Sequence, residues 1–508
     1  MSTGKVWLVG AGPGDAGLLT LKGARVLAEA EVVVYDSLVG DGVLCMIPDT
    51  ARLIDVGKRA GNHTMPQEQI NQVLLEEARK GLRVVRLKGG DPFLFGRGGE
   101  ELELLSREGV PYEVVPGVTS CIAVPAYNGI PVTHRDYCSS VHVITGHKKA
   151  GQKYDINFRA LTETKGTLVF LMGLKALPDI CQGLLEAGMD PAMPAAVLQQ
   201  GTTAGQRRVV ATISTLKEAS DKAGIRTPAI IVVGEVCRLE KEFAWYEKLP
   251  LAGCKVVVTR PRSLVSAMAQ KLRSKGAEVL ELPAIAVEPV KDRSAVTECL
   301  ERLEEYQWLA FTSPSGVDIF FDVFLREAGK DIRALGPVKI AAIGGGTSRA
   351  LEKRGIYPDL IPMNFDGASL GREMARVCEP GARILLPRAA MGNREILEEL
   401  GKRTDLQVDD VATYDTLYQS QELVDEAREV EQGEIHCAVF TSASTVRGFV
   451  RACPGLDYTK VKAACIGKQT CQAAESWGME AYTAQQASMD SLLDLVIRLK
   501  AEGKIGIS

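Results

Sequence analysis

The sequence lacks the features expected of membrane, metal-binding or nucleic-acid-binding proteins. No apolar run reaches the roughly 18 residues needed to span a bilayer, and residues 1–10 enter a strand without an export signal. The 12 cysteines form no Cys-x-x-Cys pair and only five histidines are present, so we expect no metal site. The net charge of −4, without a basic tail or stripe, argues against a nucleic-acid partner. We predict a cytoplasmic protein with reduced thiols.

The chain has the length and apolar content for several domains. Its 508 residues and 46% hydrophobic content suffice for about three globular cores. Apolar runs alternate with helical patterns, which is typical of α/β folds with largely parallel sheets. A buried strand at 227–236 precedes a charged, aromatic connector, and a new strand begins at 253. We predict domains at 1–240 and 253–508 with a linker at 241–252, and we expect the domains to be docked together.

Residues 85–100 (VRLKGGDPFLFGRGGE) are the most informative segment. Gly89 and Gly90 allow backbone to approach a ligand closely, and Asp91 adds a carboxylate before the Pro92 turn. A plain strand–helix connection would also account for the Gly-Gly-Asp sequence. The mixture of basic, glycine and aromatic residues favours a ligand site.

A second glycine-rich loop, residues 10–15, lacks dinucleotide-binding spacing. Gly10, Gly12 and Gly14 alternate, Pro13 interrupts them, and the Asp15 carboxylate would repel a pyrophosphate. We therefore do not expect a Rossmann nicotinamide site.

The second half contains an internal repeat. Residues 310–317 recur as 439–446, and residues 341–347 recur as 464–470. In each copy a strand ends in hydroxyl residues at a helix start, where side chains cap the helix and free amides can hold anions. Capping alone would explain each motif singly. The repeated order predicts two similar lobes facing one cleft.

Taken in order, the motifs of residues 4–240 resemble the tetrapyrrole methylase family, specifically the uroporphyrinogen-III C-methyltransferases. The resemblance implies two lobes with the methyl donor S-adenosylmethionine held between them, and no metal. The matching segments are 10–15, 34–36, 57–59, 86–100, 114–120, 129–135, 145–147, 171–173, 201–207 and 228–235. By motif, the cofactor positions are Pro13, Gly89, Gly90, Asp91, Leu94, Thr119, Ser120, Met172 and Gly201.

The resemblance also implies catalytic residues. Asp36, at the end of an apolar strand, fits a general base, although it could instead cap a helix with Ser37. The family places a proton-donating lysine at Lys58, where the alternative is a solvated basic turn. A polycarboxylate substrate requires cations. The candidates for binding it are Arg97 and Arg135, together with Arg86, Lys88 and His134.

Residues from about 254 to the end resemble uroporphyrinogen-III synthases. The resemblance implies two α/β lobes joined by a two-stranded ribbon, for which 279–290 and 408–418 have the right extended character. One lobe would be built from both ends of this half and the other from its middle. Tyr414 matches the family's candidate acid, or is a hinge tyrosine that merely packs. The expected substrate-binding residues are Ser313, Thr347, Arg388, Ser442 and Thr470.

The two resemblances together imply a bifunctional enzyme. The second half would cyclise hydroxymethylbilane to uroporphyrinogen III with inversion of ring D. The first half would methylate C2 and C7, giving precorrin-2 for sirohaem and cobalamin. The alternative is an active methylase with a degenerate, non-catalytic synthase-like domain. The expected partners are small tetrapyrroles, with no nucleic acid or membrane, and a homodimer formed through the methylase domain.

Overall fold

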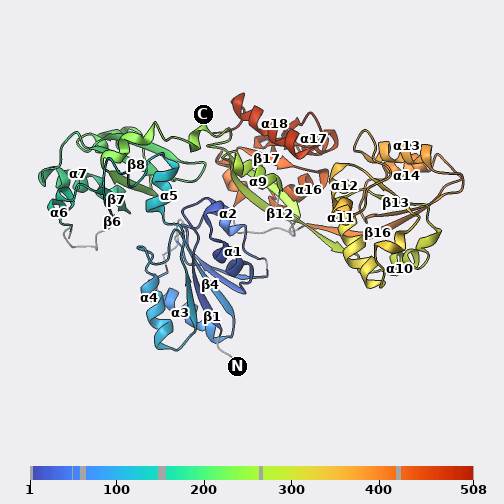
Figure 1. The fold of residues 1–508 in the computed structure, drawn as a ribbon, viewed down its shortest axis with the longest axis horizontal. Helices are drawn as coiled ribbons and strands as arrows, with labels where there is room; N and C mark the ends of the chain where they lie inside the picture. The colour runs from blue at the N-terminus through green and yellow to red at the C-terminus, as the bar shows by residue number, and fades with distance from the viewer. Residues whose placement is uncertain are drawn as a thin grey trace.

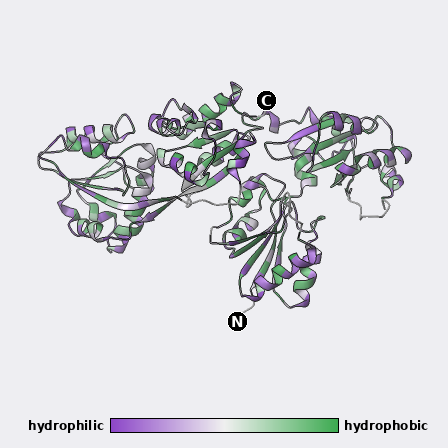
Figure 2. Ribbon diagram, turned by 180° about the vertical axis from the view of Figure 1, so that it is seen from behind, coloured by the Kyte–Doolittle hydropathy of each residue, from purple (hydrophilic) through white to green (hydrophobic). Residues whose placement is uncertain are grey.

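The computed structural model describes residues 4–48, 50–57, 65–146, 156–261, 267–418 and 425–506. The chain forms four α/β lobes on three sheets (Figure 1). Apolar residues concentrate on the strands inside each lobe, and hydrophilic residues concentrate on the outer helices (Figure 2). None of the helices in these described ranges combines the length and apolar character that a membrane span requires.

The first lobe is a five-stranded parallel sheet in the order β3-β2-β4-β1-β5. Helices α1 and α2 cover one face and α3 and α4 cover the other. Because both faces are covered, valine-rich strands such as β2 are buried throughout. The strands are β1 (Lys5–Gly10), β2 (Val32–Tyr35), β3 (Arg52–Asp55), β4 (Arg83–Lys88) and β5 (Tyr112–Val115). The helices are α1 (Leu21–Ala28), α2 (Asp41–Leu44), α3 (Gln67–Arg79) and α4 (Gly98–Arg107).

The second lobe is a mixed sheet in the order β6-β7-β10-β8-β9, in which only β6 and β7 pair in parallel. Helix α5 packs on one face, and α7 and α8 pack on the other. The strands are β6 (Val141–Thr145), β7 (Thr167–Leu171), β8 (Pro194–Gln199), β9 (Arg207–Thr212) and β10 (Ala229–Val233). The helices are α5 (Ser120–Tyr127), α6 (Phe158–Glu163), α7 (Leu177–Glu186) and α8 (Leu216–Lys222).

The connector after the second lobe is docked against both halves. The rings of Trp245 and Tyr246 each lie 5.0 Å from the ring of Tyr127. Tyr246 Oη donates a 3.2 Å hydrogen bond to the carbonyl of Gly276 in the second half. The expectation of docked domains agrees with these contacts.

The second half is built on one nine-stranded sheet in the order β14-β13-β15-β16-β12-β11-β17-β18-β19. Only β12 and β16 pair antiparallel, from Ile285–Tyr418 to Pro289–Tyr414, and they form the ribbon between two lobes. The strands are β11 (Lys255–Pro261), β12 (Glu278–Pro289), β13 (Trp308–Phe311), β14 (Lys339–Ala342), β15 (Arg383–Ala389), β16 (Gln407–Tyr418), β17 (Cys437–Phe440), β18 (Lys462–Cys465) and β19 (Glu480–Thr483).

We call the lobe that contains β11 and β17 to β19 the proximal lobe, and the lobe that contains β13 to β15 the distal lobe. The predicted ribbon and the predicted path of the chain are both confirmed. The proximal helices are α9 (Ala267–Ser274), α15 (Glu426–Glu431), α16 (Ala443–Ala452), α17 (Lys468–Glu475) and α18 (Met489–Ala501). The distal helices are α10 (Ser294–Glu301), α11 (Pro314–Ile319), α12 (Gly345–Glu352), α13 (Gly367–Val377) and α14 (Glu395–Leu400).

Candidate active sites

The loops after three neighbouring strands of the first lobe, β4, β1 and β5, contact one another. Gly12 and Gly90 exchange two backbone hydrogen bonds of 3.2 and 2.7 Å. A Cβ added to Gly10 would lie 2.5 Å from Gly117 Cα, so only glycine permits this close approach. The predicted cofactor positions Pro13, Gly89 and Gly90 therefore lie on one sheet edge, next to the segment that leads to Thr119 and Ser120.

Asp91 shapes this edge through the backbone. Its Oδ1 accepts hydrogen bonds from the amides of Phe93 (2.9 Å) and Leu94 (3.0 Å), and its Oδ2 accepts one from Gly117 (3.0 Å). These bonds tie the loop after β4 to the loop after β5. Asp91 thus holds in place the loops that would carry a ligand.

The second lobe brings its predicted residues to the same place. Leu94 packs against the cluster that contains Val124 of α5 and Leu171, the residue before Met172. A Cβ on Gly201 would lie 2.3 Å from Val124 Cγ1, so Gly201 fits tightly against α5. We call the meeting point of residues 10–15, 89–97, 116–120, 172 and 200–206 the lobe junction.

Backbone strain marks the lobe junction, and the sequence motifs alone did not indicate it. Six non-glycine residues have positive φ in the described chain, and all but Lys165 lie here. Such conformations are costly for residues with a Cβ and tend to occur at functional sites. The residues at the junction are Phe95, Arg97, Met172, Gln200 and Thr202.

The junction fits a ligand that lies against backbone. Gly90 has φ 68°, and a Cβ there would meet no atom closer than Ser120 N, 4.0 Å away. Phe93 and Met172 expose 56% and 53% of their area although both are apolar. Open space at a glycine beside exposed apolar side chains suits a small molecule with an apolar portion.

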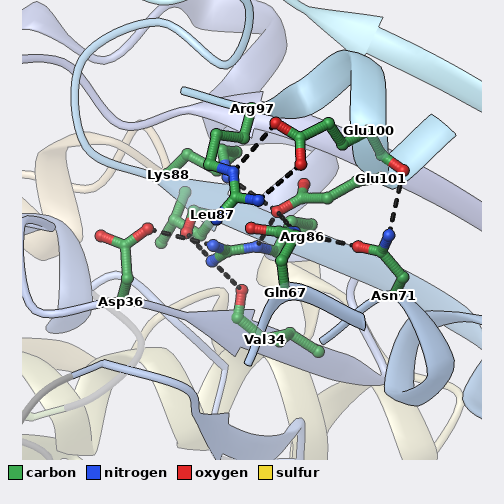
Figure 3. A network of polar contacts seen from close by, with 10 residues as sticks. All are labelled: Val34, Asp36, Gln67, Asn71, Arg86, Leu87, Lys88, Arg97, Glu100 and Glu101. Atoms are coloured by element: carbon green, nitrogen blue, oxygen red, sulfur yellow. Dashed lines mark hydrogen bonds and ion pairs between the residues drawn. The ribbon is translucent and has the colours of Figure 1, made fainter. Parts of the chain in front are cut away.

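Asp36 lies at the end of β2, directly beside this edge (Figure 3). Its Oδ2 accepts a 3.2 Å hydrogen bond from Arg86 Nη2, and its Oδ1 accepts one of 3.1 Å from the amide of Leu38. No helix begins at Ser37, because α2 starts only at Asp41. Asp36 therefore does not cap a helix, and its carboxylate is held by a guanidinium and a local turn.

Arg86 belongs to a buried ionic network behind Asp36 (Figure 3). Glu101 Oε1 accepts hydrogen bonds from Lys88 (2.7 Å), Arg86 (3.2 Å) and Gln67 (3.2 Å). The side chains of Arg86, Lys88 and Glu101 are only 3, 6 and 0% exposed. The sequence grouped Arg86 and Lys88 with cations that line an open cleft, whereas burial places them beneath the surface, where they support Asp36.

The remaining predicted residues of the first half differ in position. Lys58 lies outside the described residues, although a Cβ on the preceding Gly57 would lie 2.5 Å from the Ser37 amide, next to Asp36. Arg97 pairs with Glu100 at 2.5 Å and is half exposed. Arg135 is exposed. Binding of substrate carboxylates by these two exposed arginines stays a prediction.

The second half contains a cleft of about 1120 Å³ between the proximal and distal lobes. Gln469 Nε2 of α17 donates to both carboxylate oxygens of Glu395 in α14, at 3.2 and 3.1 Å, and so joins the two lobes. Arg447 and Arg451 of α16 line the cleft, and sequence analysis did not select them. The lining residues are Met391, Gly392, Asn393, Glu395, Thr416, Leu417, Ala443, Arg447, Arg451 and Gln469.

The repeated motifs lie at equivalent helix starts of the two lobes. Ser313 caps α11, with its Oγ accepting from the Gly316 amide at 2.9 Å, and Ser442 caps α16 in a capping box with Thr445. Thr347 and Thr470 are buried in the first turns of α12 and α17. The capping explanation thus holds for both serines, and substrate binding by these four residues stays a prediction.

Tyr414 lies on the ribbon opposite Pro289 and is only 6% exposed. Its hydroxyl shares a 2.7 Å hydrogen bond with the Ser313 hydroxyl. Burial raises the pKa of the phenol, so it stays protonated at neutral pH. Nearby Arg388 is buried and binds both oxygens of Asp410, with Nη2 2.7 Å from Oδ2. Tyr414 is therefore both packed and hydrogen-bonded, two residues before Thr416 on the cleft wall.

Comparison with known proteins agrees with both halves. The family of Tetrapyrrole (Corrin/Porphyrin) Methylases matches residues 5–217, and Uroporphyrinogen-III synthase HemD matches residues 266–494. The porphyrin biosynthesis protein HemD of Ruminiclostridium josui is 43% identical over 499 residues, which cover 98% of this chain and 99% of that protein. The chain belongs to the family of tetrapyrrole biosynthesis proteins that join a methylase domain to a uroporphyrinogen-III synthase domain. The predicted family and fold class are confirmed.

Other similar proteins match about half of this chain. The siroheme synthase of Escherichia coli O1:K1 / APEC is 52% identical over 243 residues, which are 48% of this chain and 52% of that protein. A crystal structure of uroporphyrin-III C-methyl transferase from Thermus thermophilus, complexed with S-adenyl homocysteine, is 44% identical. It covers 46% of this chain and 99% of that chain, with a TM-score of 0.41.

Proposed function

We propose that the second half is a uroporphyrinogen-III synthase and the first half a uroporphyrinogen-III C-methyltransferase. Hydroxymethylbilane would be cyclised to uroporphyrinogen III, which would then receive methyl groups at C2 and C7 to give precorrin-2 for sirohaem and cobalamin. One observation carries the proposal. The predicted cofactor positions of both lobes converge at the lobe junction, and Asp36 follows β2, which pairs with the β4 strand that leads into it.

In the methylase half, S-adenosylmethionine, when bound, supplies an electrophilic methyl group. The backbone at Gly90 and the exposed Met172 side chain are suited to contact it. An electron-rich pyrrole carbon of the substrate forms the new carbon–carbon bond, and the ring system then loses a proton. We assign acceptance of that proton to the Asp36 carboxylate, which Arg86 orients, and we keep Lys58 as the proton donor. The proposed cofactor-holding residues are Pro13, Gly89, Gly90, Asp91, Leu94, Thr119, Ser120, Met172 and Gly201.

In the synthase half, water leaves the hydroxymethyl end of the linear substrate, ring D inverts and the macrocycle closes. The departing hydroxyl takes up a proton, for which the protonated Tyr414 phenol beside Ser313 is the proposed donor. The cleft must also bind carboxylates, and Arg447 and Arg451 on its wall suit that task. Arg388, Ser313, Thr347, Ser442 and Thr470 remain the proposed orienting residues.

The fusion has a chemical rationale. Hydroxymethylbilane closes spontaneously to the wrong isomer, and tethering the two activities raises the local concentration of the correct product at the methylase. All 12 cysteines are free thiols, and most are buried, which fits the reducing cytoplasm we propose as its location. We also propose a homodimer formed through the methylase half, which sedimentation would test.

The test is to incubate the purified chain with fresh hydroxymethylbilane, with and without S-adenosylmethionine, and to identify the products by mass and isomer. We expect the type III macrocycle without the methyl donor and a dimethylated product with it. A matched Asp36→Asn chain should form the type III macrocycle and methylate it poorly. Formation of only the type I isomer would refute the synthase assignment and support a degenerate second domain. Failure of the intact chain to methylate uroporphyrinogen III would refute the methylase assignment.

A further inference from the structure

The synthase half makes a direct hydrogen bond to a loop of the methylase junction. Glu278, the first residue of β12, has its Oε2 2.7 Å from the backbone amide of Ala204 and accepts its hydrogen bond. Ala204 is buried in the loop between β8 and β9, three residues after Gly201. A residue of one enzyme half is therefore bonded to the loop that carries a proposed cofactor residue of the other half.

This loop has a conformation that needs restraint. Gln200 and Thr202 have φ angles of 45° and 73°, in the left-handed region that disfavours residues with a side chain. Within the methylase half, the Thr202 amide donates to Gln206 Oε1 at 3.0 Å, and Thr202 Oγ1 accepts from the Asp15 amide at 3.2 Å. Glu278 adds the restraint at Ala204 and comes from outside this half.

Glu278 is itself held in place by a buried cation. Lys255 Nζ lies 3.5 Å from Glu278 Oε1, 2.8 Å from Asp41 and 2.9 Å from Glu429. Burial alone would lower the pKa of Lys255, but the surrounding carboxylates raise it, so the amine is charged. Asp41 begins α2, and a Cβ on the preceding Gly40 would lie 2.5 Å from the Gly14 carbonyl of the other junction loop. The same ionic cluster thus adjoins both loops, 10–15 and 200–206.

We infer that Glu278 is a positioning residue for methylation: it holds residues 200–206 in the form that binds S-adenosylmethionine, so the synthase half completes the methylase site. This inference rests on the proposed function. Losing the bond would lower the fraction of molecules whose loop is ready to bind. The apparent dissociation constant for the cofactor rises in inverse proportion to that fraction. A buried amide that loses a charged partner shifts such an equilibrium by about tenfold or more.

The experiment uses the full chain and S-adenosylhomocysteine as the probe, with affinity measured by calorimetry. Glu278→Ala should weaken binding about tenfold, whereas the methylation rate at saturating methyl donor should change little. Glu278→Gln keeps an acceptor for the Ala204 amide and should bind within about threefold of the unaltered chain. Glu278→Asp keeps the charge, but its side chain is one methylene too short to reach the Ala204 amide, so it should bind as weakly as the alanine variant. It replaces the alanine variant in the test if that variant does not fold.

The matched control is Tyr246→Phe, which removes the hydrogen bond to Gly276 but keeps the ring and leaves the Glu278–Ala204 hydrogen bond in place. It should bind S-adenosylhomocysteine normally. Equal weakening by this control would show that loosened docking, and not positioning of the loop, is responsible. Normal binding by both Glu278→Ala and Glu278→Asp would overturn the inference. Weak binding by Glu278→Gln together with normal binding by Glu278→Asp would also overturn it, because the charge and not the hydrogen bond would then matter.

A second readout does not depend on the ligand. Hydrogen exchange over 200–206 should be faster in Glu278→Ala than in the unaltered chain and unchanged in Tyr246→Phe. If the unaltered chain bound no S-adenosylhomocysteine and methylated nothing, the proposed function would fail. The exchange data would then still decide whether Glu278 orders the loop, since equal exchange in the two chains would refute that role.

Discussion

Glu101 is the group whose replacement tests the buried network behind Asp36 most directly. Its carboxylate balances Arg86 and Lys88, and all three side chains are nearly inaccessible to water. Glu101→Gln preserves shape and an acceptor but removes the negative charge that Arg86 and Lys88 share, while Arg86 keeps its ion pair with Asp36. Breaking a buried ion pair on one side typically costs about 3 to 5 kcal/mol. For a unit of this size we expect a melting temperature about 10 °C lower at neutral pH.

The loss should depend on pH in a defined direction. Burial and the neighbouring Arg86 already lower the pKa of Lys88, and Glu101 acts to raise it, so removing Glu101 lowers it further. At pH values where Lys88 is deprotonated in the folded variant but still protonated in the unfolded chain, the free energy of unfolding rises with pH. The slope is at most about 1.4 kcal/mol per pH unit, so part of the lost stability should return as the pH rises above the pKa of Lys88 in the variant.

Scanning calorimetry of the full chain at several pH values measures both effects. The matched control is Glu103→Gln, the same substitution at an exposed position of the same helix, α4, which should change stability by less than about 0.5 kcal/mol. Equal melting of the two variants at pH 7 would refute the electrostatic reasoning. A deficit that stays constant from pH 7 to 9 would show that Lys88 does not release the proton.

Three further predictions concern the two sites. Asp36→Asn should lower the methylation rate at least 100-fold in a stopped assay without changing affinity for S-adenosylhomocysteine; unchanged turnover would exclude Asp36 as the base. Gly201→Ala places a Cβ 2.3 Å from Val124 Cγ1 and should abolish detectable S-adenosylhomocysteine binding in calorimetry while synthase activity persists; normal binding would show that the loop accommodates the methyl group. Arg451→Ala should raise the synthase KM for hydroxymethylbilane about tenfold, with a smaller effect on kcat, and an unchanged KM would remove Arg451 from the substrate-binding set.

The features that the sequence predicted well are those that local patterns encode. The resemblance to the synthases implied the ribbon, for which the extended, β-branched segments 279–290 and 408–418 were suited. The repeated hydroxyl motifs indicated two similar lobes. The strand-end position of Asp36 followed from the apolar run before it. The predicted boundaries at 240 and 253, the residue roles and the dimer stay predictions.

The features that the sequence did not predict depend on contacts between residues far apart in the chain. Arg86 and Lys88 look like surface cations, but β4 is the middle strand of its sheet and α4 brings Glu101 against them. Spacing along the chain cannot show that Glu278 bonds to Ala204, since 74 positions separate the two residues. Arg447 and Arg451 are four apart on α16, a spacing consistent with one helix face, but only the fold shows that this face lines the cleft.

The strand order of the second half has a consequence for how the chain is made. All strands of the distal lobe lie between residues 308 and 418, so a ribosome has delivered that lobe completely before β17 emerges. The proximal lobe begins earlier, with β11, but one side of β11 has no partner until β17 arrives, and the core around it also needs α18. During synthesis the valine-rich β11 therefore has an unpaired edge until β17 is made. Unpaired strand edges can form incorrect strand pairs and promote aggregation. Because the distal lobe is inserted within the proximal one, the proximal core around β11 is completed by β17 and α18, which are made only after the distal lobe.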